Sequence, residues 1–370
     1  MAVAAIDGRP ASLEAAVAAA ARLLGASRLP VIAGLGTDIA GARAAIALAE
    51  RLGGAVDHMN SAALLRDLDV ARAGGMMVTT PNEARLRGDR LLLIGSALLT
   101  AWPELPARLL TPPAPHPDGA PLDRRIAWLS PGPAAPRFPA AADIEEIGCD
   151  AGDLPGVLAA LRARVAGRSA RRTSVADKML DMLADELRGA SFGVAVWSAA
   201  ELDPLTLEML AGLVNDLNAE TRFTGLPLAP PDNAWGVLQA CGWMTGFPMR
   251  TGFGRGYPEH DPWRFDATRL IESGEADGAI WISAYRPAAP QWKASTPVIA
   301  LTGPQARFGR TPDVHIAVGC PGIDHDAIEY LPTTGTLAMV AGKTDVQTIS
   351  VARALALIAA AIPGIGALAC

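Results

Sequence analysis

The order of helical repeats and short apolar runs along the chain constrains its fold more than any other feature. Apolar residues recur at helical spacing from Ser12 to Leu24, and a short apolar run follows at 29–33. Gly34-Leu35-Gly36 closes that run, and a second helical pattern extends from Ala40 to Leu52. A helix, a buried strand, a glycine turn and another helix are typical of a parallel α/β sheet.

The same alternation recurs further along the chain and favours two α/β domains. Strands are expected at 90–95, 125–129, 192–197, 278–282, 297–301 and 314–318, and helices at 153–165, 173–187 and 205–217. A chain of 370 residues is long enough for two or three domains. We expect a discontinuous α/β domain, residues 1–60 and 188–370, with a Rossmann-like domain, residues 61–187, inserted into it.

Composition and charge argue against several classes of function. The chain has 32 basic and 38 acidic residues and a formal net charge of −6, so no basic excess is available for a nucleic acid. Its hydrophobic fraction of 50% is enough for a large core. No signal peptide is recognised, and the apolar segment 354–370 is too short to span a membrane. We therefore expect a buried C-terminal helix and a cytoplasmic protein without membrane contact.

Cysteine and histidine are too scattered to predict a metal site. The four cysteines are Cys149, Cys241, Cys320 and Cys370. None of them forms a CxxC pair, and unpaired cysteines fit a reducing compartment. The five histidines are also dispersed, and Asp324-His325-Asp326 is interpreted as a turn and a cap. We expect no metal ion and no cofactor.

Two local sequences resemble the beginnings of functional motifs. Gly34-x-Gly36 opens a dinucleotide-binding fingerprint, but Ile39 stands where the third glycine is needed. Asp57 lies at the right distance for the acidic residue of that fingerprint, yet only two apolar residues precede it. Ser96 follows a strand without the GxSxG context of a nucleophile. Ordinary turn and loop roles are favoured, and no catalytic residue is assigned.

The segment from Gly242 to Phe265 is the most unusual part of the sequence, because glycines alternate there with aromatic residues. We expect an ordered, irregular loop. Arg250, Arg255 and His260 lie in it, and its glycines would allow backbone amides to face an anion or a carbonyl group. Aromatic residues and arginine are also enriched where a chain contacts a partner subunit. Both interpretations stay open, with Arg250, Arg255 and His260 as the candidates for a ligand cleft.

A series of short motifs in a shared order resembles the B subunit of formylmethanofuran dehydrogenase, a molybdopterin oxidoreductase. The resemblance extends from about Ala15 to Lys343. Its motifs are Arg28-Leu29-Pro30, Ala49-Glu50-x-x-Gly53, Glu83-x-Arg85-x-Arg87-x-Asp89, Thr245-Gly246-Phe247-Pro248, Gly256-Tyr257-Pro258, Glu275-x-Asp277 and Pro321-Gly322-Ile323-Asp324. It implies two Rossmann-like lobes with parallel sheets, resembling domains II and III of molybdopterin oxidoreductases.

The departures from that family concern its redox centres. The family has an iron–sulfur cysteine cluster before the first helix, and this sequence has no cysteine before Cys149. Ala63 occupies the position of the molybdenum or tungsten ligand, and a methyl group cannot bind a metal. Gly95-Ser96-Ala97 replaces Gly-x-Asn-Pro, and residues 130–134 replace an Asp-x-Arg-x-Thr run that binds the pterin dinucleotide. The resemblance thus implies a fold that has lost its cofactors.

A chain with these departures is similar to the B subunit of the bacterial formyltransferase/hydrolase complex. That resemblance implies a non-catalytic structural subunit, whose partners are an amidohydrolase-like A subunit, a β-helical C subunit and a formyltransferase D subunit. The complex would convert a formyl group on a pterin carrier to formate through a methanofuran-like carrier. Two alternatives remain: an oxidoreductase subunit of the formylmethanofuran dehydrogenase type, and a binding module for the formyl carrier.

Overall fold

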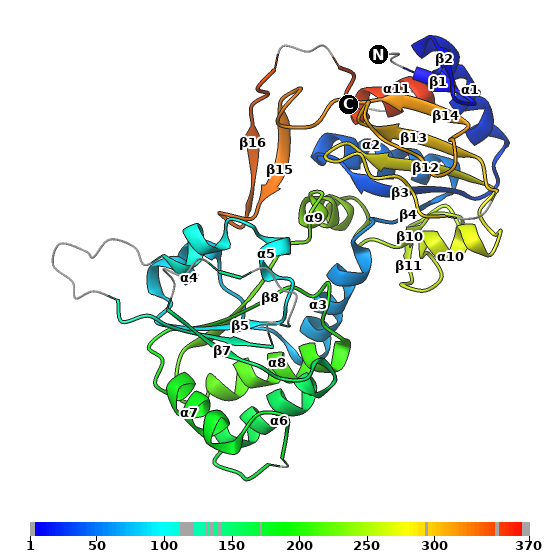
Figure 1. The fold of residues 1–370 in the computed structure, drawn as a ribbon. Coiled ribbons are helices and arrows are strands. Elements are labelled where there is room, and N and C mark those ends of the chain that lie inside the picture. Colours follow the sequence, from blue (N-terminus) through cyan, green and yellow to red (C-terminus); the bar gives the residue numbers. More distant parts are fainter. Residues whose placement is uncertain are drawn as a thin grey trace. The chain divides into compact units, whose positions relative to one another are not determined.

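The computed structural model divides the chain into two compact units (Figure 1). It describes residues 4–111, 122–130, 132, 137–138, 143–170, 172–292, 295–344 and 348–364. Unit 1 comprises Met1–Ser61, Pro231–Tyr330 and Leu337–Cys370, and unit 2 comprises Ala62–Pro230 and Leu331–Thr336. Residues 188–230, which were expected in the first domain, lie in unit 2. The two strands in this segment, at 193–197 and 223–227, belong to the sheet of unit 2.

Unit 1 is built on a nine-stranded sheet. Its strands, in spatial order, are β11 (Glu259–His260), β10 (Thr251–Gly252), β4 (Ala55–Val56), β3 (Pro30–Gly36), β12 (Gly278–Ser283), β13 (Val298–Thr302), β14 (Val314–Ala317), β1 (Ala4–Ile6) and β2 (Arg9–Ala11). The helices of this unit are α1 (Leu13–Ala26), α2 (Ile39–Leu52), α9 (Ala234–Thr245), α10 (Ala267–Glu272) and α11 (Val351–Ala361).

The nine-stranded sheet is mixed, which corrects the expectation of a parallel sheet in both lobes. The five central strands, β4, β3, β12, β13 and β14 in spatial order, are parallel to one another. The edge strands pair in the antiparallel sense, β1 and β2 at one edge and β10 and β11 at the other. At the first edge, Asp7 and Gly8 both have positive φ and connect β1 to β2 in a two-residue hairpin. Such a tight connection can join only antiparallel strands.

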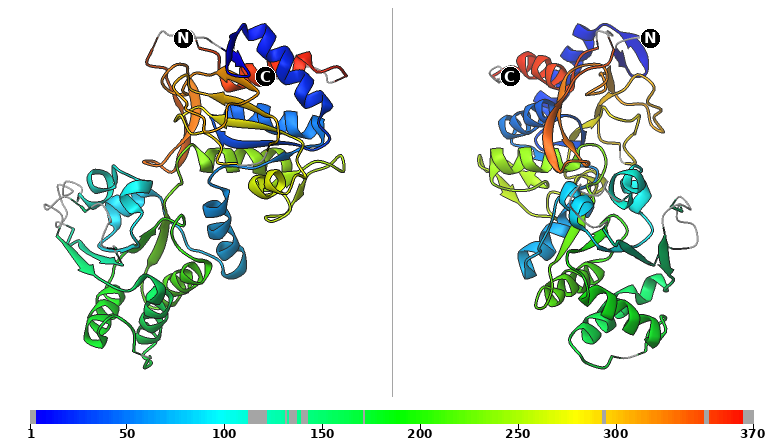
Figure 2. Two further views of the ribbon diagram at one scale, coloured as in Figure 1. Left: turned by 45° about the vertical axis from the view of Figure 1, so that its right-hand side comes forward. Right: turned by 90° about the vertical axis from the view of Figure 1, so that its left-hand side faces the viewer.

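Alternating side chains divide the core of unit 1 between the two faces of the sheet. One face carries Ile32, Ile280, Ile282, Ile299 and Leu301, which pack against α1, α2, α9 and α11 (Figures 1 and 2). The opposite face carries their sequence neighbours, including Val31 and Trp281, and packs against α10. Burial on both faces explains why these strands read as continuous apolar runs.

Unit 2 is built on a five-stranded sheet in which all strands are parallel, as expected. Its strands, in spatial order, are β7 (Ile144–Ile147), β6 (Arg125–Leu129), β5 (Arg90–Ile94), β8 (Gly193–Trp197) and β9 (Phe223–Pro227). Its helical segments are α3 (Ser61–Gly74), α4 (Pro81–Arg87), α5 (Leu98–Ala101), η1 (Pro106–Leu110), η2 (Ala151–Asp153), α6 (Leu154–Val165), α7 (Asp177–Arg188) and α8 (Pro204–Leu217).

A further pair of strands and the C-terminal helix complete the described chain. β15 (Ala327–Leu331) and β16 (Thr336–Val340) form a separate two-stranded sheet. The C-terminal helix is α11, and the end of the segment in which it was expected, residues 365–370 with Cys370, lies outside the described residues. None of the helices in the described ranges is long and apolar enough to cross a membrane.

Candidate functional site

The glycine turn after β3 is explained by packing. Gly34 has a φ of +80°, and a Cβ atom there would lie 2.5 Å from the backbone oxygen of Ile282 on the neighbouring strand. The carboxylate of Asp38 accepts the backbone N–H of Gly41 at 3.0 Å and the hydroxyl of Thr37 at 3.2 Å, and so caps α2. A dinucleotide phosphate at this helix N-terminus would meet a negative charge that already occupies it.

Two buried tryptophans close the carboxyl edge of the sheet in unit 2, where open α/β folds bind their ligands. The indole N–H of Trp128 donates to the carbonyl oxygen of Gly95 at 2.8 Å. The indole N–H of Trp197 donates to the Asp67 carboxylate at 2.9 Å. Burial raises the pKa of Asp67 to about 6, against the opposing effect of this indole. The two indole groups thus occupy the carbonyl group of Gly95 and the carboxylate of Asp67 near this edge of the sheet.

The loop between β8 and α8 is also held by contacts within unit 2. The guanidinium of Arg66, on α3, donates to the carbonyl oxygen of Ala199 at 2.6 Å and reaches two further carbonyl groups of that loop. The hydroxyl of Ser96 donates to the carboxylate of Glu201. The loop after β8 is therefore bonded both to α3, through Arg66, and to the residue Ser96 that follows β5.

This arrangement does not fit a pterin dinucleotide or its metal. Ala63, at the position of the metal ligand in the resembled family, is a buried residue of the α3 helix. The carbonyl group of Gly95 and the hydroxyl group of Ser96 are both engaged within the chain. Among the described residues, no group of three or more His, Cys, Asp or Glu side chains is placed to hold a metal ion. Residues 131 and 133–136, part of the altered dinucleotide segment, lie outside the described residues.

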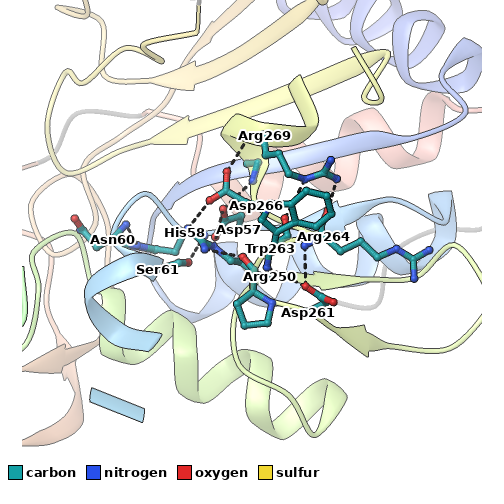
Figure 3. Close-up of polar contacts among 12 residues, drawn as sticks. Asp57, His58, Asn60, Ser61, Arg250, Asp261, Trp263, Arg264, Asp266 and Arg269 are labelled. Atoms are coloured by element: carbon teal, nitrogen blue, oxygen red, sulfur yellow. Dashed lines mark hydrogen bonds and ion pairs between the residues drawn. The ribbon is translucent and has the colours of Figure 1, made fainter. Parts of the chain in front are cut away.

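A charged cluster in unit 1 contains the first of the predicted cleft residues, Arg250. Figure 3 shows Arg250 between Asp57, at the end of β4, and Asp266, the N-cap of α10. Its Nη2 lies 2.6 Å from an oxygen of Asp266, and its Nε lies 3.5 Å from an oxygen of Asp57. Its Nη1 donates to the carbonyl oxygen of Pro262 at 2.7 Å. Two carboxylates thus balance this guanidinium, which leaves it no excess charge for an anionic ligand.

Burial changes the acidity of Asp57. The side chain accepts the backbone N–H of Ala267 at 2.9 Å, and its second oxygen has no hydrogen-bond partner among the described residues. Burial raises the pKa of Asp57 to about 6, although Arg250 and the Ala267 amide oppose the change. Sequence reasoning considered Asp57 only as an acidic residue of a nucleotide motif, and it missed the pairing with Arg250.

His58, next to Asp57, is buried in its neutral form. Its Nδ1 accepts the backbone N–H of Asn60 at 2.9 Å, so Nε2 carries the proton and donates to the carbonyl oxygen of Asp232 at 3.1 Å. Burial lowers the pKa of His58 to about 4, and the positive charge of Arg286 adds to this effect. Because both ring nitrogens are bonded within unit 1, this histidine stabilises the loop after β4.

Arg255 and His260, the other two predicted cleft residues, do not converge with the Arg250 guanidinium on a common point. Arg255 is mostly exposed and forms an ion pair with Glu259 at 3.3 Å. His260 donates from Nδ1 to the backbone carbonyl oxygen of Arg250 at 3.0 Å, and its ring stacks on Phe247. Most of the segment 242–265 is irregular, as expected, but it begins with the end of α9 and contains the short strands β10 and β11 before the turn that leads to α10.

Comparisons with known proteins identify the family. No protein-family model matches the chain. The B subunit of the "Formyltransferase/hydrolase complex Fhc" of Methylorubrum extorquens is 39% identical over 321 residues, 86% of this chain and 85% of that protein. The B subunit of the "Tungsten-containing formylmethanofuran dehydrogenase 2" of Methanocaldococcus jannaschii is 24% identical over 340 residues, 88% of this chain and 77% of that protein.

A solved structure agrees with the sequence comparison. It is the crystal structure of the formyltransferase/hydrolase complex FhcABCD from Methylorubrum extorquens, in complex with methylofuran. The match has a TM-score of 0.84 and 37% sequence identity, and it covers 96% of this chain and 97% of the matched chain. The chain therefore belongs to the family of B subunits of the formyltransferase/hydrolase complex, which is related to the B subunits of formylmethanofuran dehydrogenase.

Proposed function

We propose that this chain is a structural, non-catalytic subunit of a formyltransferase/hydrolase complex. It assembles with the A, C and D subunits, and the complex moves a formyl group from a pterin carrier, through a methanofuran-like carrier, to formate. The observation that carries the non-catalytic role is the carboxyl edge of the sheet in unit 2. There Trp128, Trp197, Arg66 and Ser96 are bonded to groups of the chain itself, and Ala63 replaces the metal ligand.

The assembly is supported by the family. The matched solved structure is a complex of four kinds of subunit, and the matched B subunit is named as part of that complex. Without ligands of its own, the chain would contribute the surfaces of its fold to the complex. This reasoning gives the chain a role in holding the assembly together.

Two alternative functions rest on specific observations. The 24% identity to a tungsten-containing dehydrogenase subunit is the observation behind an oxidoreductase, whereas the contacts of Gly95 and Ser96 oppose it. The methylofuran in the matched complex favours a module that binds the formyl carrier. For the second alternative, Arg255 and His260 are the better candidates, because the Arg250 guanidinium is already paired with two carboxylates.

Purification of the intact complex tests the proposal. The chain is co-expressed with the A, C and D subunits of the same organism, and the complex is analysed for composition, tungsten, molybdenum and formyl hydrolysis. We expect all four subunits, no stoichiometric metal of either kind bound to this chain, and unchanged turnover in an Arg255→Gln/His260→Asn variant. Stoichiometric tungsten or molybdenum in this subunit would establish the oxidoreductase. A loss of turnover in the assembled variant would establish the carrier-binding role.

A further inference from the structure

The end of α9 and the hairpin beside it expose an unusual number of large apolar side chains. Trp243 is 66% exposed and Trp263 is 71% exposed. We use the name aromatic face for the five exposed residues Trp243, Met244, Phe247, Tyr257 and Trp263. The stacking of Phe247 on His260 joins the end of α9 to β11. Side chains of this kind are enriched in the centre of protein interfaces, and exposed clusters of them mark binding surfaces.

The exposed area of the aromatic face suits a protein partner. Aromatic side chains bury 150–250 Å² each, so the four aromatic residues, at their exposed fractions, offer roughly 450 Å², to which Met244 adds. A standard interface buries about 800 Å² on each partner. Together these side chains therefore expose more than half of the area that one side of a stable protein contact buries.

The charges around the aromatic face are paired within the chain. Arg255 and Arg264 share the carboxylate of Glu259, at 3.3 and 4.0 Å, and the carboxylate of Asp261, which accepts the backbone N–H of Arg264 at 2.8 Å, supplies a second negative charge. Arg269 forms an ion pair with Glu275, and its guanidinium also lies 4.3 Å from the ring centre of Trp263. The surface thus presents rings with little unbalanced charge. Phosphate groups of nucleic acids or lipids need unpaired cations, whereas an apolar protein surface does not.

The buried ion cluster holds the aromatic face in place. Arg250 lies at the start of the hairpin, with a φ of +61°, and its guanidinium forms ion pairs with Asp57, directly after β4, and with Asp266, the N-cap of α10. It also donates a hydrogen bond to the carbonyl oxygen of Pro262, directly before Trp263. A surface that is fixed before binding loses less conformational entropy when it binds.

We infer that the aromatic face docks onto an uncharged apolar surface of another subunit of the complex. This inference rests on the proposed function and names the surface that performs it. Because tryptophans at the centre of an interface are frequent hot spots, with losses of 2 kcal/mol or more, each of Trp243 and Trp263 is expected to contribute roughly 30-fold to affinity.

The test compares two double variants in the intact complex. Trp243→Gln/Trp263→Gln removes the most exposed rings of the aromatic face, and Met182→Gln/Leu205→Gln removes two half-exposed apolar side chains of unit 2. Each variant is co-expressed with the A, C and D subunits, and dissociation is followed by mass photometry on dilution. We expect dissociation at concentrations at least 30-fold higher for the tryptophan variant, no change for the control, and little dependence on salt.

The outcomes separate this inference from the proposed function. Failure of the wild-type chain to assemble with the A, C and D subunits would overturn both. Wild-type behaviour of the tryptophan variant in a complex that does form would overturn the docking surface alone. Self-association of the isolated wild-type chain that the variant abolishes would assign the aromatic face to a second copy. A thermal transition of the isolated tryptophan variant well below that of the control would assign the rings to the chain's own fold. Self-association of this kind and a lowered thermal transition would each overturn the inference.

Discussion

Replacement of Asp57 by asparagine should change how the stability of unit 1 depends on pH. Burial raises the pKa of Asp57 from 3.8 to about 6. At about 1.4 kcal/mol for each pH unit, ionisation of this buried carboxyl costs the folded state about 3 kcal/mol at neutral pH. In the wild type, the stabilising contribution of Asp57 to the free energy of unfolding is therefore fully present below pH 4. It is lost as the pH rises through 6. The asparagine side chain would retain the acceptor for the Ala267 amide without the charge.

The assay is urea unfolding of both proteins between pH 4 and pH 8, with hydrogen exchange in residues 250–266 to report on unit 1 separately. The free energy of unfolding of Asp57→Asn, relative to the wild type, should rise by about 2 to 3 kcal/mol from pH 4 to pH 7. The control is Asp69→Asn, which removes an exposed carboxylate paired with Arg72 at 3.2 Å and should change stability by less than about 0.5 kcal/mol. Parallel pH curves for Asp57→Asn and the wild type would refute the reasoning.

The contribution of His58 to stability changes with pH in the opposite direction to that of Asp57, over the same pH range. Its pKa in the folded protein, about 4, is below the ordinary 6.5, so its contribution is present above pH 6.5 and is lost as the pH falls towards 4. The two neighbours therefore partly cancel in the wild type. His58→Gln can still donate to the Asp232 carbonyl, and it should show the Asp57 dependence without this compensation. The double variant should lose both of these contributions and keep the pH dependence of the remaining groups, such as buried Asp67. Three further substitutions test the packing. Gly34→Ala places a methyl group 2.5 Å from the Ile282 oxygen, so urea unfolding should show a loss of more than about 3 kcal/mol. Gly53→Ala, also at positive φ but with its nearest neighbour at 3.9 Å, should lose about 1 kcal/mol, and equal losses would contradict the steric argument. Trp197→Phe removes the hydrogen bond to buried Asp67 and leaves a gap, so it should cost about 3 kcal/mol. Wild-type stability of Trp197→Phe would show that the indole does not hold this edge of the sheet.

Periodicity predicted the buried central strands of both sheets and several of the longer helices, because burial of alternate or helically spaced side chains leaves a local pattern. β3, β5, β6 and β8 form where apolar runs predict them, and α2 begins one residue before its predicted start. β10 and β11 were missed, since each has only two residues and is rich in glycine or charge rather than apolar side chains. Their antiparallel pairing also made the larger sheet mixed.

In the candidate site, too, the local sequence predicted some features, and others depend on contacts between distant parts of the chain. The sequence identified Arg250, Arg255 and His260 as a group, since they share one segment. It did not predict that Asp57 and Asp266 neutralise Arg250, because that contact depends on β10 pairing with β4, from a distant part of the chain. His58 was passed over because nothing local shows that both ring nitrogens are bonded.

By itself, the sequence determined that the chain is an α/β protein and that it resembles a molybdopterin oxidoreductase, and this resemblance places Ala63 at the position of the metal ligand. These are properties of residue identity and of short-range spacing. Only the tertiary structure decided that the guanidinium of Arg250 is balanced, that Trp197 closes the sheet of unit 2, and that the rings of the aromatic face stay exposed. The reason is that charge balance and burial depend on which distant strands become neighbours.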